Sequence, residues 1–290
     1  MASRTLKGLI AGLGVAALAL GAVDQASAIT FNWTQRSGWV LGTETSAGTN
    51  GGIQFYNPVG TIGTSTPPAS TYEVLAWGCQ VGSSTNCAPS GATQDTDDGV
   101  ITDPRLSSRR SALEIQFGGF TGTIQDDGIP VDITRLLHYN RGIDANSVYL
   151  TGARVDSILR FTDADPPFAD ANPIPVGFDE TLNVTPCGPD QISSTPCDDI
   201  FLFDPTGFAP VQFTSSGITY EITFGIRSDD PDVLLIDLLT GKVITREGDL
   251  NDLFITMSLR RVPAPQSLVL LGLGLLGIGL ADWRRRSKQA

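Results

Sequence analysis

The central part of the chain carries short runs in which apolar and polar residues alternate, or in which β-branched and aromatic residues dominate. Alternation with a period of two places the apolar side chains on one face, as in a half-buried β-strand. Clusters of Gly, Pro, Asn, Asp and Ser separate the runs and indicate turns and long loops. The strand-like runs are residues 114–117, 147–150, 218–224 and 253–259, and the loop-like clusters are 48–52, 64–70, 163–175 and 186–196.

Many short strands separated by turns are typical of an antiparallel β-sandwich, and no segment between residues 29 and 261 keeps a helical period. We therefore predict a mainly β protein with this architecture. Two arrangements remain open for it. Residues 166–175 either link two small sandwiches or form a loop within one large sandwich. A region of this length supports a hydrophobic core in both cases.

The N-terminal segment differs from the strand region because it places one apolar run behind two positive charges. Arg4 and Lys7 precede the apolar residues 9–20, and the small residues Ala26 to Ala28 follow them. This order is typical of a secretory signal peptide, which we assign to residues 1–28. An N-terminal membrane anchor is the alternative, but the apolar run is shorter than the roughly 20 residues that a spanning helix needs.

The C-terminal segment, residues 262–288, combines a proline pair, a short apolar run and a basic end. At about 1.5 Å per residue, the apolar run 268–281 covers about 21 Å of a hydrocarbon core of about 30 Å. Its flanking residues must therefore reach the interfaces, which predicts a single transmembrane helix over 267–283. By the positive-inside rule the basic tail, 284–288, stays in the cytoplasm. A buried core helix is the alternative, but this run lacks a polar face.

The four cysteines fall into two close pairs within the region between the terminal segments. We predict disulfides between Cys79 and Cys87 and between Cys187 and Cys197, because an oxidising compartment favours them. Four cysteines permit three connectivities, so spacing alone does not fix the pairing. A metal site built from all four thiolates is the alternative, and neither pair has the C-x-x-C spacing typical of such sites.

The chain is acidic, with 31 Asp and Glu against 19 Lys and Arg and a formal net charge of −12. The predicted signal peptide and C-terminal segment contain several of the basic residues and few of the acidic ones, so the region 29–261 is more acidic still. Phosphate binding needs clustered Lys and Arg. We therefore expect no nucleic-acid partner.

Several predicted loops bring carboxylates together, and calcium in proteins takes six to eight oxygen ligands. Asp95, Asp97 and Asp98 are the calcium candidates that we single out, although no loop has the spacing of an EF-hand. Another acidic loop is 247–252. Asp and Asn are also common turn formers, which is the simpler interpretation of all these loops. We predict no cofactor, with bound calcium as the alternative.

The C-terminal segment resembles the PEP-CTERM sorting signal of Gram-negative bacteria, in which a Pro-Glu-Pro motif, a transmembrane helix and an Arg-rich end are recognised by the membrane protease exosortase. Alanine stands here in place of the usual glutamate of the motif, 262–265. The resemblance implies export by the Sec machinery, an inner-membrane precursor, and release to the cell surface or an exopolysaccharide matrix. The residues that carry it are Val262, Pro263, Ala264, Pro265, Arg284, Arg285 and Arg286.

The region 29–261 resembles the THxN family of PEP-CTERM proteins. The motif positions are Leu137, His138, Tyr139 and Asn140, with leucine where the family has threonine, and Trp77-Gly78 precedes them. This resemblance implies an exported protein and defines no reaction.

His138 is the only histidine in the chain. A zinc site with two or three histidines is therefore excluded within one chain. With Asn140 close to it, we expect a hydrogen-bonded corner in which both side chains satisfy backbone groups where strands meet. A ligand-contacting or general-base histidine is the alternative. No G-x-S-x-G elbow supports catalysis, and we predict no catalytic residue.

Two function classes follow from these observations. The first is a non-enzymatic surface or matrix protein. The second is a secreted carbohydrate-binding or carbohydrate-active protein, with calcium as an optional ligand. Aromatic side chains exposed as platforms would favour the second class, whereas burial in the core explains the same residues under the first. The tryptophans concerned are Trp33, Trp39 and Trp77.

Overall fold

The computed structural model describes residues 28–49, 51–62, 70–79, 91–92, 110–116, 120–144, 146–181, 187, 192, 197–247 and 250–263. The predicted signal peptide up to residue 27 and the sorting signal from Ala264 onwards lie outside the described residues. The calcium candidates Asp95, Asp97 and Asp98 also lie outside them. Within the described residues, no helix is long and apolar enough to cross a membrane.

Strands account for nearly all the regular structure of the described residues. They are β1 (Thr30–Val40), β2 (Thr45–Ala47), β3 (Ile53–Thr61), β4 (Ser70–Trp77), β5 (Gly91–Ala92), β6 (Ser111–Ile115), β7 (Phe120–Gln125), β8 (Val131–Tyr139), β9 (Tyr149–Phe161), β10 (Phe168–Asp179), β11 (Asp199–Phe203), β12 (Val211–Ser215), β13 (Ile218–Arg227), β14 (Val233–Asp237), β15 (Lys242–Thr245) and β16 (Leu250–Arg261). One short 3-10 helix, η1 (Pro205–Phe208), follows β11.

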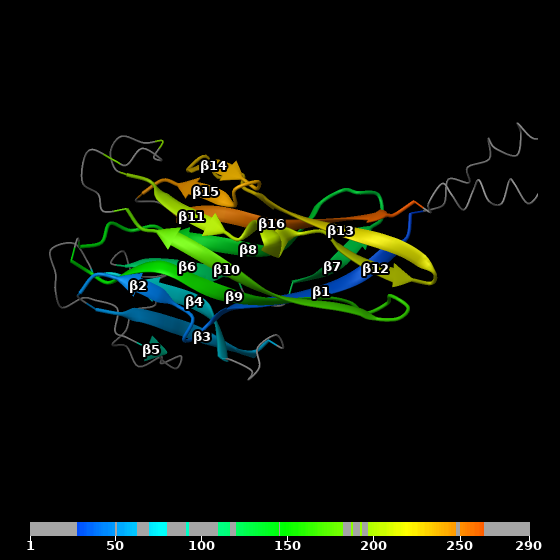
Figure 1. Cartoon of the computed structure of the whole chain (residues 1–290), viewed down its shortest axis with the longest axis horizontal. Helices are drawn as coiled ribbons and strands as arrows, with labels where there is room; N and C mark the ends of the chain where they lie inside the picture. Colours follow the sequence, from blue (N-terminus) through cyan, green and yellow to red (C-terminus); the bar gives the residue numbers. More distant parts are fainter. Residues whose placement is uncertain are drawn as a thin grey trace, which may run out of the picture.

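The described strands form one hydrogen-bonded sheet in the order β12-β13-β16-β8-β6-β4-β1-β9-β10-β11-β15-β14, with β2, β3, β5 and β7 attached to it. This sheet curls into a half-barrel whose strands run along the long axis of the molecule (Figure 1). The mainly β, antiparallel prediction is confirmed. The predicted sandwich would have two separate sheets, whereas these strands form a continuous one.

The long strands β1 and β16 explain this continuity. The first half of β1 pairs with β7 and its last two residues pair with β4, while β9 runs along its other edge. β16 pairs with β8 along one edge over Leu250–Met257 and with β13 along its other edge over Phe254–Arg261. Because β1 and β16 are each paired along their whole length, the hydrogen-bonded ladder runs without a break from one end of the molecule to the other.

Two groups of buried side chains fill the concave side of the half-barrel. The first core cluster contains Trp39, Trp77 and Phe201, and the second contains Phe161 and Met257. Full burial of a large apolar side chain contributes about 1.5–3 kcal/mol. Aromatic rings contact one another within both clusters, so these residues supply much of the stability of the fold.

Residues 168–175 lie in β10, although the sequence predicted a loop or linker there. Their backbone pairs with β9 from Phe168 to Gly177, whereas β11 covers β10 only from Val176 onwards. The backbone carbonyl of Pro175 accepts a hydrogen bond from the N–H of Asp204, so it points away from β9. The nitrogen of Pro175 points to the same side as this carbonyl. Proline is tolerated where a strand edge needs no N–H donor. Two prolines spaced by two residues therefore fit this strand.

The cysteines among the described residues form disulfide bonds. Cys187 and Cys197 form the predicted disulfide, with their Cα atoms 5.4 Å apart. Cys79 is also disulfide-bonded. Its predicted partner, Cys87, lies outside the described residues.

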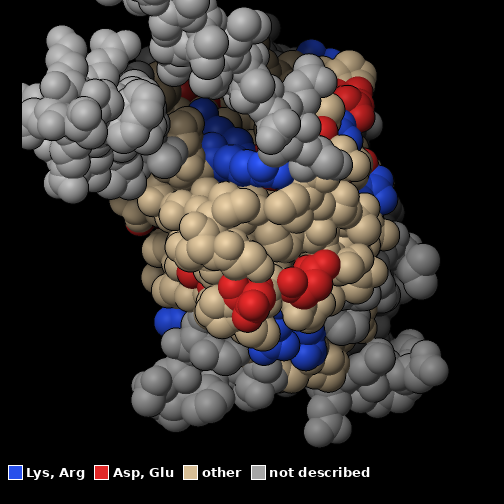
Figure 2. Space-filling model, turned by 90° about the vertical axis from the view of Figure 1, so that its right-hand side faces the viewer, with Lys and Arg blue, Asp and Glu red and all other residues tan. Residues whose placement is uncertain are grey.

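Many of the arginines of the described region are engaged by acids. Arg227 lies 2.6 Å from both Asp132 and Asp229, and Arg246 lies 2.8 Å from Asp232. Figure 2 shows one end of the molecule, where small groups of basic and acidic side chains surround an uncharged area. Surface ion pairs of this kind contribute little to stability, but they reduce the positive charge available for phosphate.

Candidate functional site

A group of buried polar side chains lies at one end of the half-barrel. At this end β4, β8, β10 and β15 finish, and their antiparallel neighbours β6, β11 and β16 begin. Strand ends that are far apart in the sequence therefore meet within the first core cluster. The fully or almost fully buried polar residues at these strand ends are Ser111, His138, Asn140, Glu180, Asp198, Asp199, Thr245, Glu247 and Asn251.

The motif residues His138 and Asn140 belong to this group, whereas Leu137 and Tyr139 face the other side of the sheet. His138 Nδ1 lies 3.1 Å from Thr245 Oγ1. Asn140 Nδ2 donates to the backbone oxygen of Arg246 at 3.1 Å. The asparagine thus satisfies a backbone group where strands meet, while the histidine contacts a side chain instead.

His138 is enclosed by aromatic rings. Its ring centroid lies 4.9 Å from that of Phe201, 5.4 Å from that of Phe178 and 6.3 Å from that of Trp77, whose ring is nearly parallel to it. Burial lowers the pKa of His138 to about 3. The imidazole is therefore neutral at physiological pH and cannot supply a positive charge to the acids beside it.

Trp77 and Gly78 fix the edge of this group at the end of β4. Gly78 has a φ of +86°, and a Cβ atom at this position would lie 2.5 Å from Cγ2 of Ile143. Glycine adopts such a conformation without steric cost, so the chain can turn directly after the buried indole. The tight turn after the buried Trp77 thus explains why glycine follows it in the Trp77-Gly78 pair.

Three carboxylates meet beside His138, and we call Glu180, Asp199 and Glu247 the acid cluster. One oxygen of each lies within 4.8 Å of the others, and all three residues are buried. Glu180 accepts hydrogen bonds from Trp77 Nε1 at 2.7 Å and from the Ser111 hydroxyl at 3.4 Å. These two donors orient the Glu180 carboxylate.

Asp199 is the acid of the cluster that lies beside the histidine. Its Oδ1 accepts the backbone N–H of Thr181 at 2.9 Å, and its Oδ2 lies 3.7 Å from His138 Nε2. Burial and the charge of Glu247 raise the pKa of Asp199 well above its usual range. Burial, followed by the charges of Asp199 and Glu247, raises the pKa of Glu180 in the same way. The site therefore opposes the ionisation of its own acids.

Several polar atoms around the acid cluster make no hydrogen bond within the described part of the chain. Both side-chain amide atoms of Asn251 are in this state, as are Oδ1 of Asn140 and Nε2 of His138. Asn251 is the cross-strand partner of His138, so the two side chains share one face of the sheet. An oxygen-rich set of this kind, with three carboxylates and two amides, is suited to hard cations.

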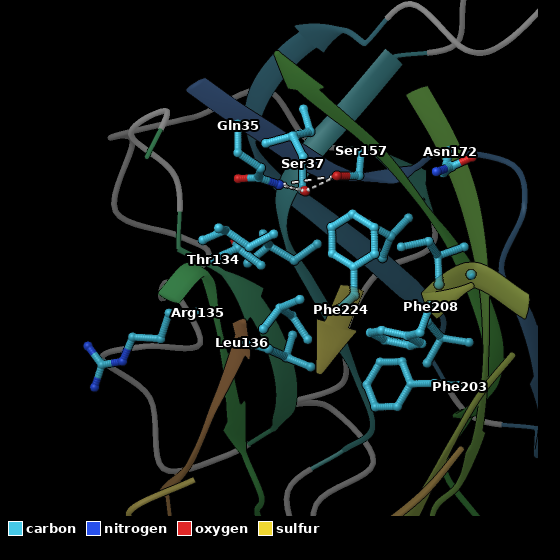
Figure 3. Close-up of a pocket in the computed structure, with 18 of the residues that line it drawn as sticks. Gln35, Ser37, Thr134, Arg135, Leu136, Ser157, Asn172, Phe203, Phe208 and Phe224 are labelled. Atoms are coloured by element: carbon cyan, nitrogen blue, oxygen red, sulfur yellow. Dashed lines mark hydrogen bonds between the residues drawn. The ribbon is translucent and has the colours of Figure 1, made fainter. Parts of the chain in front are cut away.

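A separate cavity of about 80 Å³ lies between β1, β8, β9 and β10, with η1 at its side. Its lining is mostly apolar, and it is large enough for several water molecules or a small chemical group. Figure 3 shows the rings of Phe203, Phe208 and Phe224 on one side of this pocket. Arg135 also lines the pocket, and its guanidinium pairs with Asp252.

The polar lining of the pocket comes from two places. The Gln35 amide donates to the hydroxyls of Ser37 and Ser157, and these hydroxyls lie 3.0 Å apart. Asn172 Nδ2 donates to Asp170 at 2.6 Å, and burial raises the pKa of this aspartate. The pocket thus combines aromatic surfaces with amide, hydroxyl and carboxyl groups, as many small-molecule sites do.

The structure places only some of the residues singled out from the sequence. Val262 directly follows β16 and donates its N–H to Thr219, and the rest of the sorting motif beyond Pro263 lies outside the described residues. Sequence reasoning did not select Glu180 or Asp199. Glu247 was noted only as part of an acidic loop.

Comparison with known proteins does not identify the chain. No protein-family model matches it, and no curated protein matches its sequence. The resemblance to PEP-CTERM proteins therefore rests on the sequence motifs alone.

Proposed function

We propose that this chain is an exported, non-enzymatic protein of a Gram-negative cell surface or extracellular matrix. One observation carries the proposal: a proline pair, an apolar run and three arginines follow one another after the β region, and a signal-peptide pattern precedes it. The disulfide between Cys187 and Cys197 supports it, because disulfides persist in oxidising compartments.

The proposed route has three steps. The Sec machinery exports the chain, and residues 1–28 are removed. The helix 267–283 then holds the precursor in the inner membrane with residues 284–288 in the cytoplasm. Exosortase finally cleaves near the motif 262–265 and releases the β region towards the surface or an exopolysaccharide layer.

Intact-mass measurement of the protein from its native host tests this route. We expect a product that begins at Ile29, lacks the segment beyond the 262–265 motif, and has four oxidised cysteines. A variant in which Arg284, Arg285 and Arg286 are replaced by glutamine should accumulate as a longer precursor. Recovery of the full-length chain with reduced thiols from the cytosol would refute the proposal.

A second candidate function is carbohydrate binding, which the pocket favours. Phe208 and Phe224 offer aromatic faces, and Asn172 and Asp170 offer polar groups beside them. Asp170 is the one carboxylate among the described lining residues, whereas most glycosidases use two. Against this candidate, Trp33, Trp39 and Trp77 are buried and present no exposed platform. We therefore rank it second, and as binding rather than hydrolysis.

Titration calorimetry with oligosaccharides from the host matrix tests the second candidate. If the pocket binds sugar, Phe208→Ala and Asn172→Ala should each weaken binding by about tenfold or more, which corresponds to about 1.4 kcal/mol. Thr214→Ala, an exposed change on β12, serves as the control and should leave binding unchanged. Absence of binding, or equal binding by all variants, would rule this function out.

A further inference from the structure

We propose that Glu180, Asp199 and Glu247 bind one calcium ion at the buried end of the half-barrel, with Asn140 and Asn251 completing the oxygen ligands. This site differs from the loop 95–98 considered from the sequence. It also stands independently of the export route, because it rests on the described side chains alone.

Charge is the first argument. The three carboxylates lie within 4.8 Å of one another in the interior. Glu180 and Asp199 receive their hydrogen bonds from Trp77, Ser111 and Thr181, which are neutral donors. Buried charges in proteins are paired or coordinate metals, because an isolated ionised group loses a large hydration energy. A divalent cation between these acids would offset the repulsion among the three carboxylates.

The unsatisfied amides are the second and independent argument. Asn251 is fully buried and neither its Oδ1 nor its Nδ2 has a hydrogen-bond partner among the described residues. Asn140 Oδ1 is in the same state, although its Nδ2 holds the carbonyl of Arg246, the residue before Glu247. A buried polar atom without a partner is costly, and an ion or water is the usual explanation. Asn251 shares a face of the sheet with its cross-strand partner His138, whose Nε2 lies 3.7 Å from Asp199 Oδ2.

The ligand types select calcium among the divalent cations. Three carboxylates provide up to six oxygens when they bind in the bidentate mode, and two amide oxygens bring the set to the six to eight that calcium takes. Magnesium retains several water molecules and would not fit an enclosed site of this kind. Zinc prefers nitrogen and sulfur ligands. His138 is the one nitrogen ligand nearby, and its Nδ1 already contacts Thr245.

The geometry gives the ion a structural role. Its ligands come from the end of β8, the end of β10, the start of β11, the turn after β15 and the start of β16. The ion would therefore tie together strands that are distant in the sequence. Because ligand binding to the folded state alone raises stability by mass action, calcium should stabilise the fold.

Thermal unfolding of the full exported protein, with its disulfides intact, is the primary test. The protein is freed of metal with EDTA, and calcium chloride alone is then added back. At a calcium concentration of 100 times Kd we expect Tm to increase by about 5 °C or more. Magnesium and zinc chlorides should give smaller increases at the same concentration. No increase with calcium would overturn the proposal, and a larger increase with zinc or magnesium would overturn the choice of ion.

Substitutions locate the ion. Asp199→Asn and Glu247→Gln should weaken calcium binding at least tenfold in titration calorimetry. In EDTA they should unfold at the wild-type temperature or above, because each removes one of three mutually repelling charges. Asp179→Asn, an exposed change beside Glu180, is the matched control and should retain the calcium response. Unchanged binding in the first two variants would refute this site.

A luminescence measurement covers the case in which these variants fail to fold. Terbium is a hard ion that replaces calcium and emits when a nearby indole is excited. Trp77 donates its indole N–H to Glu180, so bound terbium should show strong emission that calcium displaces. Trp77→Phe should remove most of this emission, whereas Trp39→Phe should not. Emission that is absent, or that survives calcium addition, would contradict the proposal.

Discussion

At the residue scale, the acid cluster occupies positions that strand alternation assigns to the core. Glu180 lies two residues after Phe178, and Asp199 lies two residues before Phe201. Residues spaced by two share one face of a strand, so both acids continue a buried row. The sequence could therefore have marked Glu180 and Asp199 as polar residues at inward positions. It could not show that they meet, because that depends on pairing between distant strands.

The hydrogen bond from Trp77 to Glu180 can be tested against a tryptophan that lacks one. Both Trp77 and Trp39 are fully buried, and Trp39 Nε1 has no hydrogen-bond partner among the described residues. Replacement by phenylalanine removes a similar volume at both sites. Loss of the donor should make Trp77→Phe more destabilising than Trp39→Phe by about 1–3 kcal/mol in urea unfolding. Equal losses would show that this hydrogen bond contributes nothing.

At the element scale, the central strands were predictable and β10 was not. The runs 218–224 and 253–259 alternate clearly and lie inside β13 and β16. The segment that forms β10 is rich in proline, which usually indicates a loop. Its edge position makes proline acceptable, and the neighbours of a strand cannot be read from its own residues. The joining of all strands into one curled sheet was unpredictable for the same reason.

Because one edge of β10 is open, the loss of stability on substitution by proline should depend strongly on which residue of the strand is replaced. Ala169 has its N–H on the same side as Pro173 and Pro175 and is exposed, whereas Asn172 points its N–H towards β9. Ala169→Pro should therefore cost about 1 kcal/mol or less. Asn172→Pro removes a hydrogen bond within the sheet and should cost about 3 kcal/mol or more. Urea unfolding measures both losses of stability. Similar losses for the two variants would show that the edge of β10 facing away from β9 is not open.

At the scale of the whole molecule, β1 and β16 join the two core clusters into one unit. Leu253 belongs to the first cluster and Leu259 to the second, and both are fully buried on β16. Between these two leucines, every residue of β16 is paired with a neighbouring strand. We therefore interpret the described β region as a single cooperative domain rather than two small ones.

Calorimetry on two matched variants tests this cooperativity. Leu253→Ala and Leu259→Ala should each destabilise by about 2–5 kcal/mol. Each should shift the same single unfolding transition to lower temperature, with equal calorimetric and van't Hoff enthalpies. Two separate transitions, with each variant shifting only one of them, would instead indicate two independent domains.

Asp126 contacts both ends of the described chain, since it accepts from the N–H of Ile29 and pairs with Arg261. β16 runs from this point to Asn251, a distance of about 30 Å at roughly 3.3 Å per residue. The two ends of the described chain therefore lie side by side, at the end of the half-barrel opposite the one where β8 and β10 finish (Figure 1). A molecule tethered by either end would hold its carboxylate-rich pole outward, away from the supporting surface.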